Sequence, residues 1–180
     1  GHKWADISEG SYGVSLMNDC KYGYSMKNRV MTQTLIKSGT EPNLTADQEE
    51  HFFTYSLYPH AGTWREAGTE QEALNLNVPA KAVAGAAEKD RMEFLSVDKR
   101  DVVLETVKKA EDGDGVIVRL YEVENARTKV TLHCAEAIAS AEETDLLENP
   151  IEGALGVKEN EIELTIKPYE IRTIRIRTAK

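Results

Sequence analysis

Two short segments of the sequence combine aromatic and polar side chains in a way that suits sugar binding. One contains Asn18, Asp19 and Tyr22, and the other surrounds His60 within residues 58–65. Sugars present apolar faces that stack on aromatic rings, and hydroxyls that need directed hydrogen bonds from carboxylates and amides. These four residues are therefore candidates for lying near a bound sugar, with simple packing of the aromatic rings as the more frequent alternative.

Other site chemistries find less support in the sequence. The four histidines lack ligand partners at three- or four-residue spacing, so we expect no metal site in this chain. The run Asp112-Gly113-Asp114-Gly115 is part of a calcium-loop pattern, but Val116 stands where the third oxygen ligand belongs, which predicts a hairpin turn instead. Dinucleotide-binding and serine-hydrolase glycine motifs are absent. The 31 acidic residues offer many carboxylate pairs for glycoside hydrolysis, but the sequence singles out none.

Charge and composition exclude several classes of protein. The 180 residues carry a formal net charge of −9, which argues against a nucleic-acid partner because phosphate binding needs clustered cations. No apolar run is long enough to span a bilayer, and the first 30 residues do not read as a signal peptide. The two cysteines, Cys20 and Cys134, lie far apart and are expected to be reduced thiols, with a disulfide as the less frequent alternative. We therefore expect a soluble, cytoplasmic protein without a membrane partner.

The candidate residues must be positioned mainly by β-strands, because apolar residues alternate with period two in short runs between turns. No expected strand is followed by the amphipathic helix that a parallel crossover needs. The pattern predicts an all-β fold, an antiparallel β-sandwich forming a single domain over residues 1–180. The expected strands cover residues 13–16, 29–36, 50–58, 91–97, 101–108, 115–122, 129–134, 161–166 and 171–177.

The sequence also predicts local features at residues 63–75, in the strand at 50–58 and in the last strand. Residues 63–75 favour either one short helix, with Trp64, Ala67, Gln71 and Leu74 on a shared face, or an ordered loop, because Gly68 interrupts the pattern. The strand at 50–58 has bulky residues on both faces and is expected to be covered on both sides. The arginines at 172, 175 and 177 are expected on the solvated side of the last strand, which need not neighbour the strand at 161–166.

Several runs of the sequence are similar to one known family. They are residues 1–9 (GHKWADISE), 12–24 (YGVSLMNDCKYGY), 46–48 (ADQ), 53–62 (FTYSLYPHAG), 118–122 (VRLYE), 144–148 (TDLLE) and 167–171 (KPYEI). In this order they resemble the C-terminal region of α-mannosidases of glycoside hydrolase family 38, along essentially the whole chain. Ser25, Thr63 and residues 38–44 depart from the family pattern, which weakens the assignment of any one loop residue to a substrate contact.

The resemblance implies a β-sandwich from a much larger enzyme that removes α-linked mannose with retention of configuration. In that family a divalent metal, usually zinc, and an aspartate nucleophile belong to an N-terminal barrel domain, to which no part of this chain corresponds. The resemblance therefore implies no catalytic residue, metal ligand or cofactor here, and no activity of this chain alone. The implied partners are the catalytic domain of the same enzyme and mannosides, and a homo-oligomer stays open.

Three functional hypotheses follow. The first is a C-terminal β-sandwich that supports the catalytic barrel and lends a loop to the sugar pocket, with residues 18–24 as the first choice of loop and 58–60 as the second. The second is an independent carbohydrate-binding module. The third is a purely structural domain that makes interdomain or oligomer contacts.

Overall fold

The computed structural model describes residues 1–86 and 88–179, and their contacts divide the chain into two compact units. The first unit covers residues 1–85 and the second begins at Ala86. A division by contacts does not show whether the two units fold together or separately, so the single domain expected over residues 1–180 stays a prediction.

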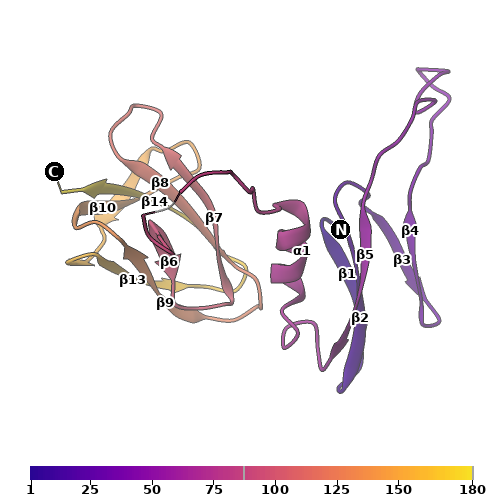
Figure 1. Cartoon of the computed structure of the whole chain (residues 1–180), viewed down its shortest axis with the longest axis horizontal. Coiled ribbons are helices and arrows are strands. Elements are labelled where there is room, and N and C mark those ends of the chain that lie inside the picture. Colours follow the sequence, from indigo (N-terminus) through magenta and orange to yellow (C-terminus); the bar gives the residue numbers. More distant parts are fainter. Residues whose placement is uncertain (87, 180) are drawn as a thin grey trace. The chain divides into compact units, whose positions relative to one another are not determined.

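The first unit is built on a three-stranded antiparallel sheet in the order β1-β2-β5, accompanied by a hairpin and a helix (Figure 1). Its elements are β1 (Trp4–Ser8), β2 (Tyr12–Asn18), β3 (Gly23–Lys27), β4 (Val30–Thr34), β5 (Tyr55–Ala61) and α1 (Thr69–Asn77). Strands β3 and β4 pair with each other as the hairpin. Helix α1 packs on one face of the sheet, where the indole of Trp4 donates to Glu70 at 2.5 Å.

The helix confirms the short helix expected near residues 63–75 but shifts its boundaries. Gly68 adopts a left-handed φ of 67°, and the helix begins directly after it. The buried side chains of the helix are Thr69 and Ala73, which are four residues apart. The expected face through Trp64 and Leu74 is therefore wrong, because Gly68 breaks the helical register on which it was based.

Strand β5 is covered on one face, whereas the strand at 50–58 was expected to be covered on both. Ser56, Tyr58 and His60 point to one face of the strand and are half-buried or buried, whereas Tyr55 and Leu57 on the other face are 58% and 65% exposed. The strand lies at the edge of its sheet and is covered on one side only. Bulky residues on both faces predicted a second covering layer, which the described residues do not provide over Tyr55 and Leu57.

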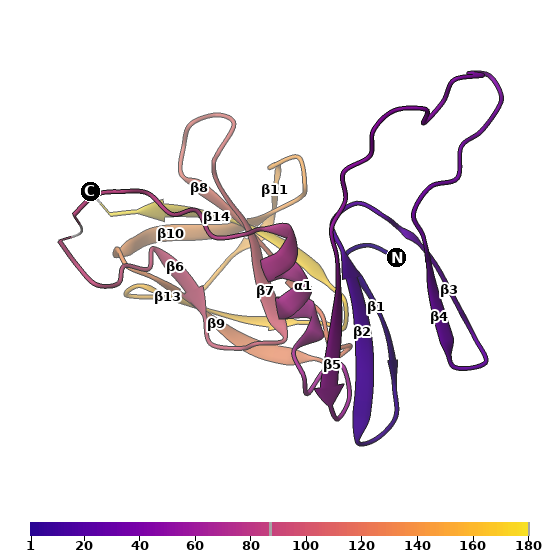
Figure 2. The same cartoon turned by 45° about the vertical axis from the view of Figure 1, so that its right-hand side comes forward.

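The second unit is the β-sandwich, and Figure 2 shows its two layers. One sheet has the order β11-β10-β14-β8-β7 and the other the order β12-β13-β9-β6. The strands are β6 (Leu95–Val97), β7 (Val102–Lys109), β8 (Val116–Glu122), β9 (Thr128–Cys134), β10 (Ile138–Thr144), β11 (Pro150–Ala154), β12 (Val157–Lys158), β13 (Glu161–Ile166) and β14 (Ile171–Thr178). All strand pairs in this unit are antiparallel, as the sequence predicted.

Alternate residues of the two sheets meet in the core of the sandwich. Val118, Leu120 and Ile174 come from the five-stranded sheet and pack with Leu132 and Ile162 of the other, and all five are 0% exposed. Complete burial of one such side chain stabilises the fold by about 1.5–3 kcal/mol. Strands β13 and β14, which are consecutive in sequence, belong to different sheets, so the turn between them carries the chain across the sandwich.

The arginines of β14 differ from the solvated row that was expected. Arg175 is only 6% exposed and pairs with Asp112 at 2.6 Å, while Arg177 pairs with Asp114 at 2.7 Å. The turn at 110–115 follows β7 and leads into its hairpin partner β8, as predicted, and its aspartates neutralise the arginines of β14. Cys20 and Cys134 are both free thiols. The helix in the described part of the chain is too short to cross a bilayer.

Candidate functional site

Asp19 and Tyr22 lie in the loop between β2 and β3, and Asn18, the last residue of β2, anchors its start. The Asn18 side chain is fully buried, its Oδ1 accepts the backbone N–H of Lys21 at 2.5 Å, and its amide donates to the hydroxyl of Tyr24. Asn77 at the end of α1 donates to the Asn18 carbonyl at 3.0 Å. Because Asn18 is inaccessible in this chain, its part in any ligand site is to hold the loop.

Asp19 is an accessible carboxylate in this loop, and it is held by a segment distant in sequence. The backbone N–H of Thr54 lies 3.0 Å from both carboxylate oxygens, and the Asp19 N–H donates back to the Thr54 carbonyl. The Thr54 N–H lowers the pKa of Asp19, so the carboxylate is ionised at neutral pH. Such a carboxylate can accept hydrogen bonds from sugar hydroxyls. The same carboxylate raises the pKa of the neighbouring Cys20 thiol, which makes that thiol a poorer nucleophile.

Aromatic rings lie next to this loop. The Lys21 ammonium sits 5.0 Å from the centre of the Phe53 ring, and Phe53 stacks on Tyr55 with ring centres 6.4 Å apart. Tyr22 is 52% exposed and contacts the ring of His2. Phe53 and Tyr55 were expected in a strand covered on both sides, so the sequence did not indicate them as residues near the candidate site. Their alternation with polar residues was visible, but their proximity to Asp19 depends on a contact between residues 35 positions apart.

The structure does not bring His60 to the other three candidates. His60 pairs with Gly13 of β2, whereas Asn18 pairs with Tyr55, so five residues of strand, about 17 Å, separate the two places. The His60 side chain is buried and lies 2.8 Å from the carboxylate of Asp6. A Cβ on Gly13 would come within 2.4 Å of the imidazole, so glycine at this strand position makes room for His60.

The buried group around His60 contains serine, histidine and aspartate, but its geometry is structural. The Ser15 hydroxyl donates to Asp6 at 2.7 Å and therefore receives its bond from the Thr69 hydroxyl, at 2.8 Å. A nucleophilic serine would instead donate to the imidazole, which would take its proton. Ser15 does not, and it is 0% exposed. The network ties α1 to the sheet.

A metal centre is not formed within the described residues. Among the side chains that the structure describes, no three of His, Cys, Asp or Glu converge to hold an ion. The histidine of the second unit is His133. It lies 3.2 Å from Glu161 of the neighbouring strand, and both side chains are partly exposed. The residues described here therefore do not fit the zinc that the resemblance implies for the larger enzyme.

Comparison with known proteins decides the family. Two family models match the chain. The model for the "Glycosyl hydrolases family 38 C-terminal domain" matches residues 1–45, and the model for the "Glycosyl hydrolases family 38 C-terminal beta sandwich domain" matches residues 101–174. Alpha-mannosidase 2C1 of Mus musculus is 37% identical over 180 residues, covering 96% of this chain. The chain belongs to glycosyl hydrolase family 38 and corresponds to the C-terminal region of its members.

Further relatives agree with this family 38 assignment. Alpha-mannosidase G of Dictyostelium discoideum is 36% identical over 97% of the chain. The family 38 chain spans 17% of the length of each of these two curated relatives. In fold, it is similar to the crystal structure of an alpha-mannosidase from Enterococcus faecalis V583, with a TM-score of 0.75 at 21% identity, over 97% of this chain and 20% of that one.

Proposed function

We propose that this chain is the C-terminal part of a metal-dependent, retaining α-mannosidase, in which it supports the catalytic barrel and lends the loop at residues 18–24 to the sugar pocket. The observation that carries the proposal is the similarity to α-mannosidases along 96% of the chain, combined with its small share, 17%, of their length. A cytoplasmic location and mannosides as substrates of the whole enzyme belong to the same proposal. The chain alone is expected to be inactive.

The composition of the first unit supports a covering partner. Among residues 1–85, the buried apolar side chains are Leu16, Met17 and Ala73. A larger number of apolar side chains in the same unit is exposed: Tyr12, Tyr22, Met26, Val30, Leu35, Ile36, Leu44, Phe52, Tyr55, Leu57, Val78 and Val83. Where such side chains adjoin one another, exposed apolar surface marks a binding or docking face. It favours a unit whose core is completed by another part of the enzyme.

The loop at 18–24 would act by positioning. An ionised Asp19 can accept hydrogen bonds from mannose hydroxyls, and the rings of Tyr22 and Tyr55 offer exposed apolar surfaces beside it. Because Asn18 and the Thr54 backbone already hold the loop, a sugar bound there would not have to order it. The catalytic acid and nucleophile, and the Lewis-acid chemistry of a divalent metal, would come from the barrel domain.

The test is Asp19→Ala in the full-length enzyme. We expect kcat/KM for an α-mannoside to fall more than tenfold while the unfolding temperature changes little. Asp19→Asn keeps the shape of the side chain and removes its charge, and the exposed Glu49→Ala in the same unit is the matched control. Wild-type kinetics of Asp19→Ala would remove Asp19 from the site.

A carbohydrate-binding module is the second candidate function, favoured by the exposed rings of Tyr22 and Tyr55 beside Asp19. Titration of the chain with mannose and α-mannobiose distinguishes a carbohydrate-binding module from a domain that only supports the catalytic barrel. Saturable heat would support an independent module, whereas a positioning domain or a purely structural one gives none.

A further inference from the structure

The loop at residues 145–149, between β10 and β11 of the second unit, is held rigidly by its own first and last residues. One carboxylate oxygen of Asp145 accepts the backbone N–H of Leu147 at 2.8 Å and that of Asn149 at 2.9 Å. The Asn149 side chain donates to the other oxygen at 2.9 Å and lowers the pKa of Asp145. The carboxylate is therefore ionised at neutral pH, where these bonds are strongest.

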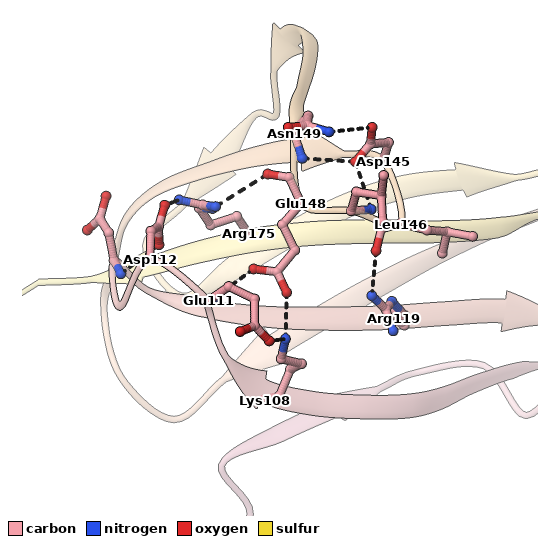
Figure 3. A network of polar contacts seen from close by, with 11 residues as sticks. Lys108, Glu111, Asp112, Arg119, Asp145, Leu146, Glu148, Asn149 and Arg175 are labelled. Atoms are coloured by element: carbon pink, nitrogen blue, oxygen red, sulfur yellow. Dashed lines mark hydrogen bonds and ion pairs between the residues drawn. The ribbon is translucent and has the colours of Figure 1, made fainter.

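The sheet beneath holds the same loop from the other side, as Figure 3 shows. Arg119 of β8 donates to the Leu146 carbonyl at 2.9 Å, and Arg175 of β14 donates to the Glu148 carbonyl at 3.3 Å. The Glu148 carboxylate receives the Lys108 ammonium at 2.6 Å and the Glu111 backbone N–H at 2.9 Å. All of these bonds go to the backbone of the loop or to Glu148, so they fix its path.

This rigid loop presents two leucines to solvent. Leu146 is 60% exposed and Leu147 is 82% exposed. They line a groove together with Ile151 and Ile171, which are 48% and 60% exposed. We call these four side chains the leucine patch. Glu143 and Asp145 give the groove a polar margin, an arrangement typical of a docking surface.

We propose that the leucine patch is the docking surface for the remainder of the α-mannosidase polypeptide, the part that lies outside this chain. The inference rests on the proposed function, and it identifies one surface of the sandwich through which this region would contact the rest of the enzyme. A loop already ordered before contact loses little entropy on docking, so apolar burial is not offset by the cost of ordering it.

The small size of the leucine patch favours a covalently joined partner over a second copy of the chain. A stable contact between two copies buries about 800 Å² on each, with roughly 20–30 residues a side. Four apolar side chains do not supply such an area. A partner joined covalently meets the patch at an effective concentration on the order of millimolar, so a small contact suffices. The relatives carry such a partner, because the segment that matches this chain is 17% of their length.

The experiment measures whether the patch is covered in the full-length enzyme. Leu147→Cys and Ile171→Cys are labelled with a maleimide, and the modified peptides are quantified by mass spectrometry. Met92→Cys is the matched control, because Met92 belongs to the same unit, is 83% exposed like Leu147 and lies outside the leucine patch. We expect both patch cysteines to react at least tenfold more slowly than the control in the folded enzyme, and all three to react alike in denaturant. Fast labelling at both patch positions would overturn the proposal.

A second measurement identifies what covers the patch. Photo-methionine is incorporated into Leu147→Met, a change that conserves volume, in a mixture of light and ¹⁵N-labelled enzyme. Cross-links from the peptide containing position 147 to peptides outside residues 1–180 of the same polypeptide support the proposal. Cross-links between light and heavy copies would assign the patch to a dimer and overturn it, as would the absence of cross-links. Hydrolysis of α-mannosides is assayed on the same preparations, so a failure of the proposed function is seen separately from a failure of docking.

Discussion

At the scale of single residues, Glu122 shows how one buried carboxylate can organise two turns. Glu122 ends β8 and is 1% exposed. Its oxygens accept the backbone N–H groups of Glu124, Asn125 and Ala126 at 2.7–3.0 Å, and that of Tyr169 at 2.8 Å. The first three belong to the connection to β9 and the last to the turn between the two sheets. The carboxylate thus joins two crossings of the sandwich.

Removing this carboxylate is expected to be costly. Glu122→Ala leaves four backbone donors without their acceptor, and each buried unpaired group costs about 1–3 kcal/mol unless water reaches it. With partial hydration, we expect the free energy of unfolding in urea to fall by about 2–4 kcal/mol. Glu136→Ala, at an exposed position, is the control and should change it by less than about 0.5 kcal/mol. Equal effects of the two changes would contradict the role given to Glu122.

At the scale of elements, the loop at 145–149 and the hairpin turn at 110–115 are held by ionised carboxylates. The Lys108 ammonium, followed by the Glu111 N–H, lowers the pKa of Glu148. The Asp114 N–H, followed by Arg175, lowers the pKa of Asp112. A carboxyl group whose pKa is lower in the folded state than in the unfolded state binds fewer protons when folded. Its stabilising effect is therefore complete above about pH 5 and is lost as pH falls through the folded pKa.

This linkage predicts how stability depends on pH. The unfolding temperature should fall as the pH is lowered from 7 to 3, because Glu148, Asp112 and Asp145 must take up protons. Glu148→Gln removes one of these groups, so the variant should unfold at a lower temperature than wild type at pH 7. The difference in unfolding temperature should become smaller toward pH 3. Calorimetry at a series of pH values measures this. A difference that stays constant with pH would show that Glu148 does not act through its charge.

At the scale of the whole molecule, the two units differ in how much apolar surface they bury. The sandwich has a continuous core, whereas the first unit buries few apolar side chains. Both tryptophans, Trp4 and Trp64, belong to the first unit. Their fluorescence therefore reports on that unit alone, which allows the predicted single domain over residues 1–180 to be tested.

Ile174→Ala provides that test. Ile174 lies in the core of the sandwich and is fully buried, so its truncation should destabilise the sandwich by about 2–5 kcal/mol. If residues 1–180 unfold as a single domain, the urea midpoint from tryptophan fluorescence moves together with the midpoint from far-ultraviolet circular dichroism. An unchanged fluorescence midpoint, with only the dichroism shifted, would show that the two units unfold independently.

Part of this structure could be predicted because it depends on neighbours in sequence. Period-two alternation placed the strands at 116–122, 161–166 and 171–178 nearly correctly, since side chains of a strand alternate between its faces. The hairpin turn at 110–115 followed from its glycines and aspartates. Strands without clear alternation were missed: β1, β3, β10, β11 and β12. Several of these are short or exposed, and their pairing partners, more than their own residues, make them strands.

By itself, the sequence determined the all-β class, the approximate strands, the family and the grouping of Asn18, Asp19 and Tyr22, because adjacent residues share a loop wherever it lies. The tertiary structure alone decided that Thr54 holds Asp19, that His60 is buried against Asp6, and that Arg175 is buried beneath the loop at 145–149. Each of these contacts joins residues at least 25 positions apart, and strand pairing brings them together. The chain's alternation shows which residues share a face, but not which strand each face will meet.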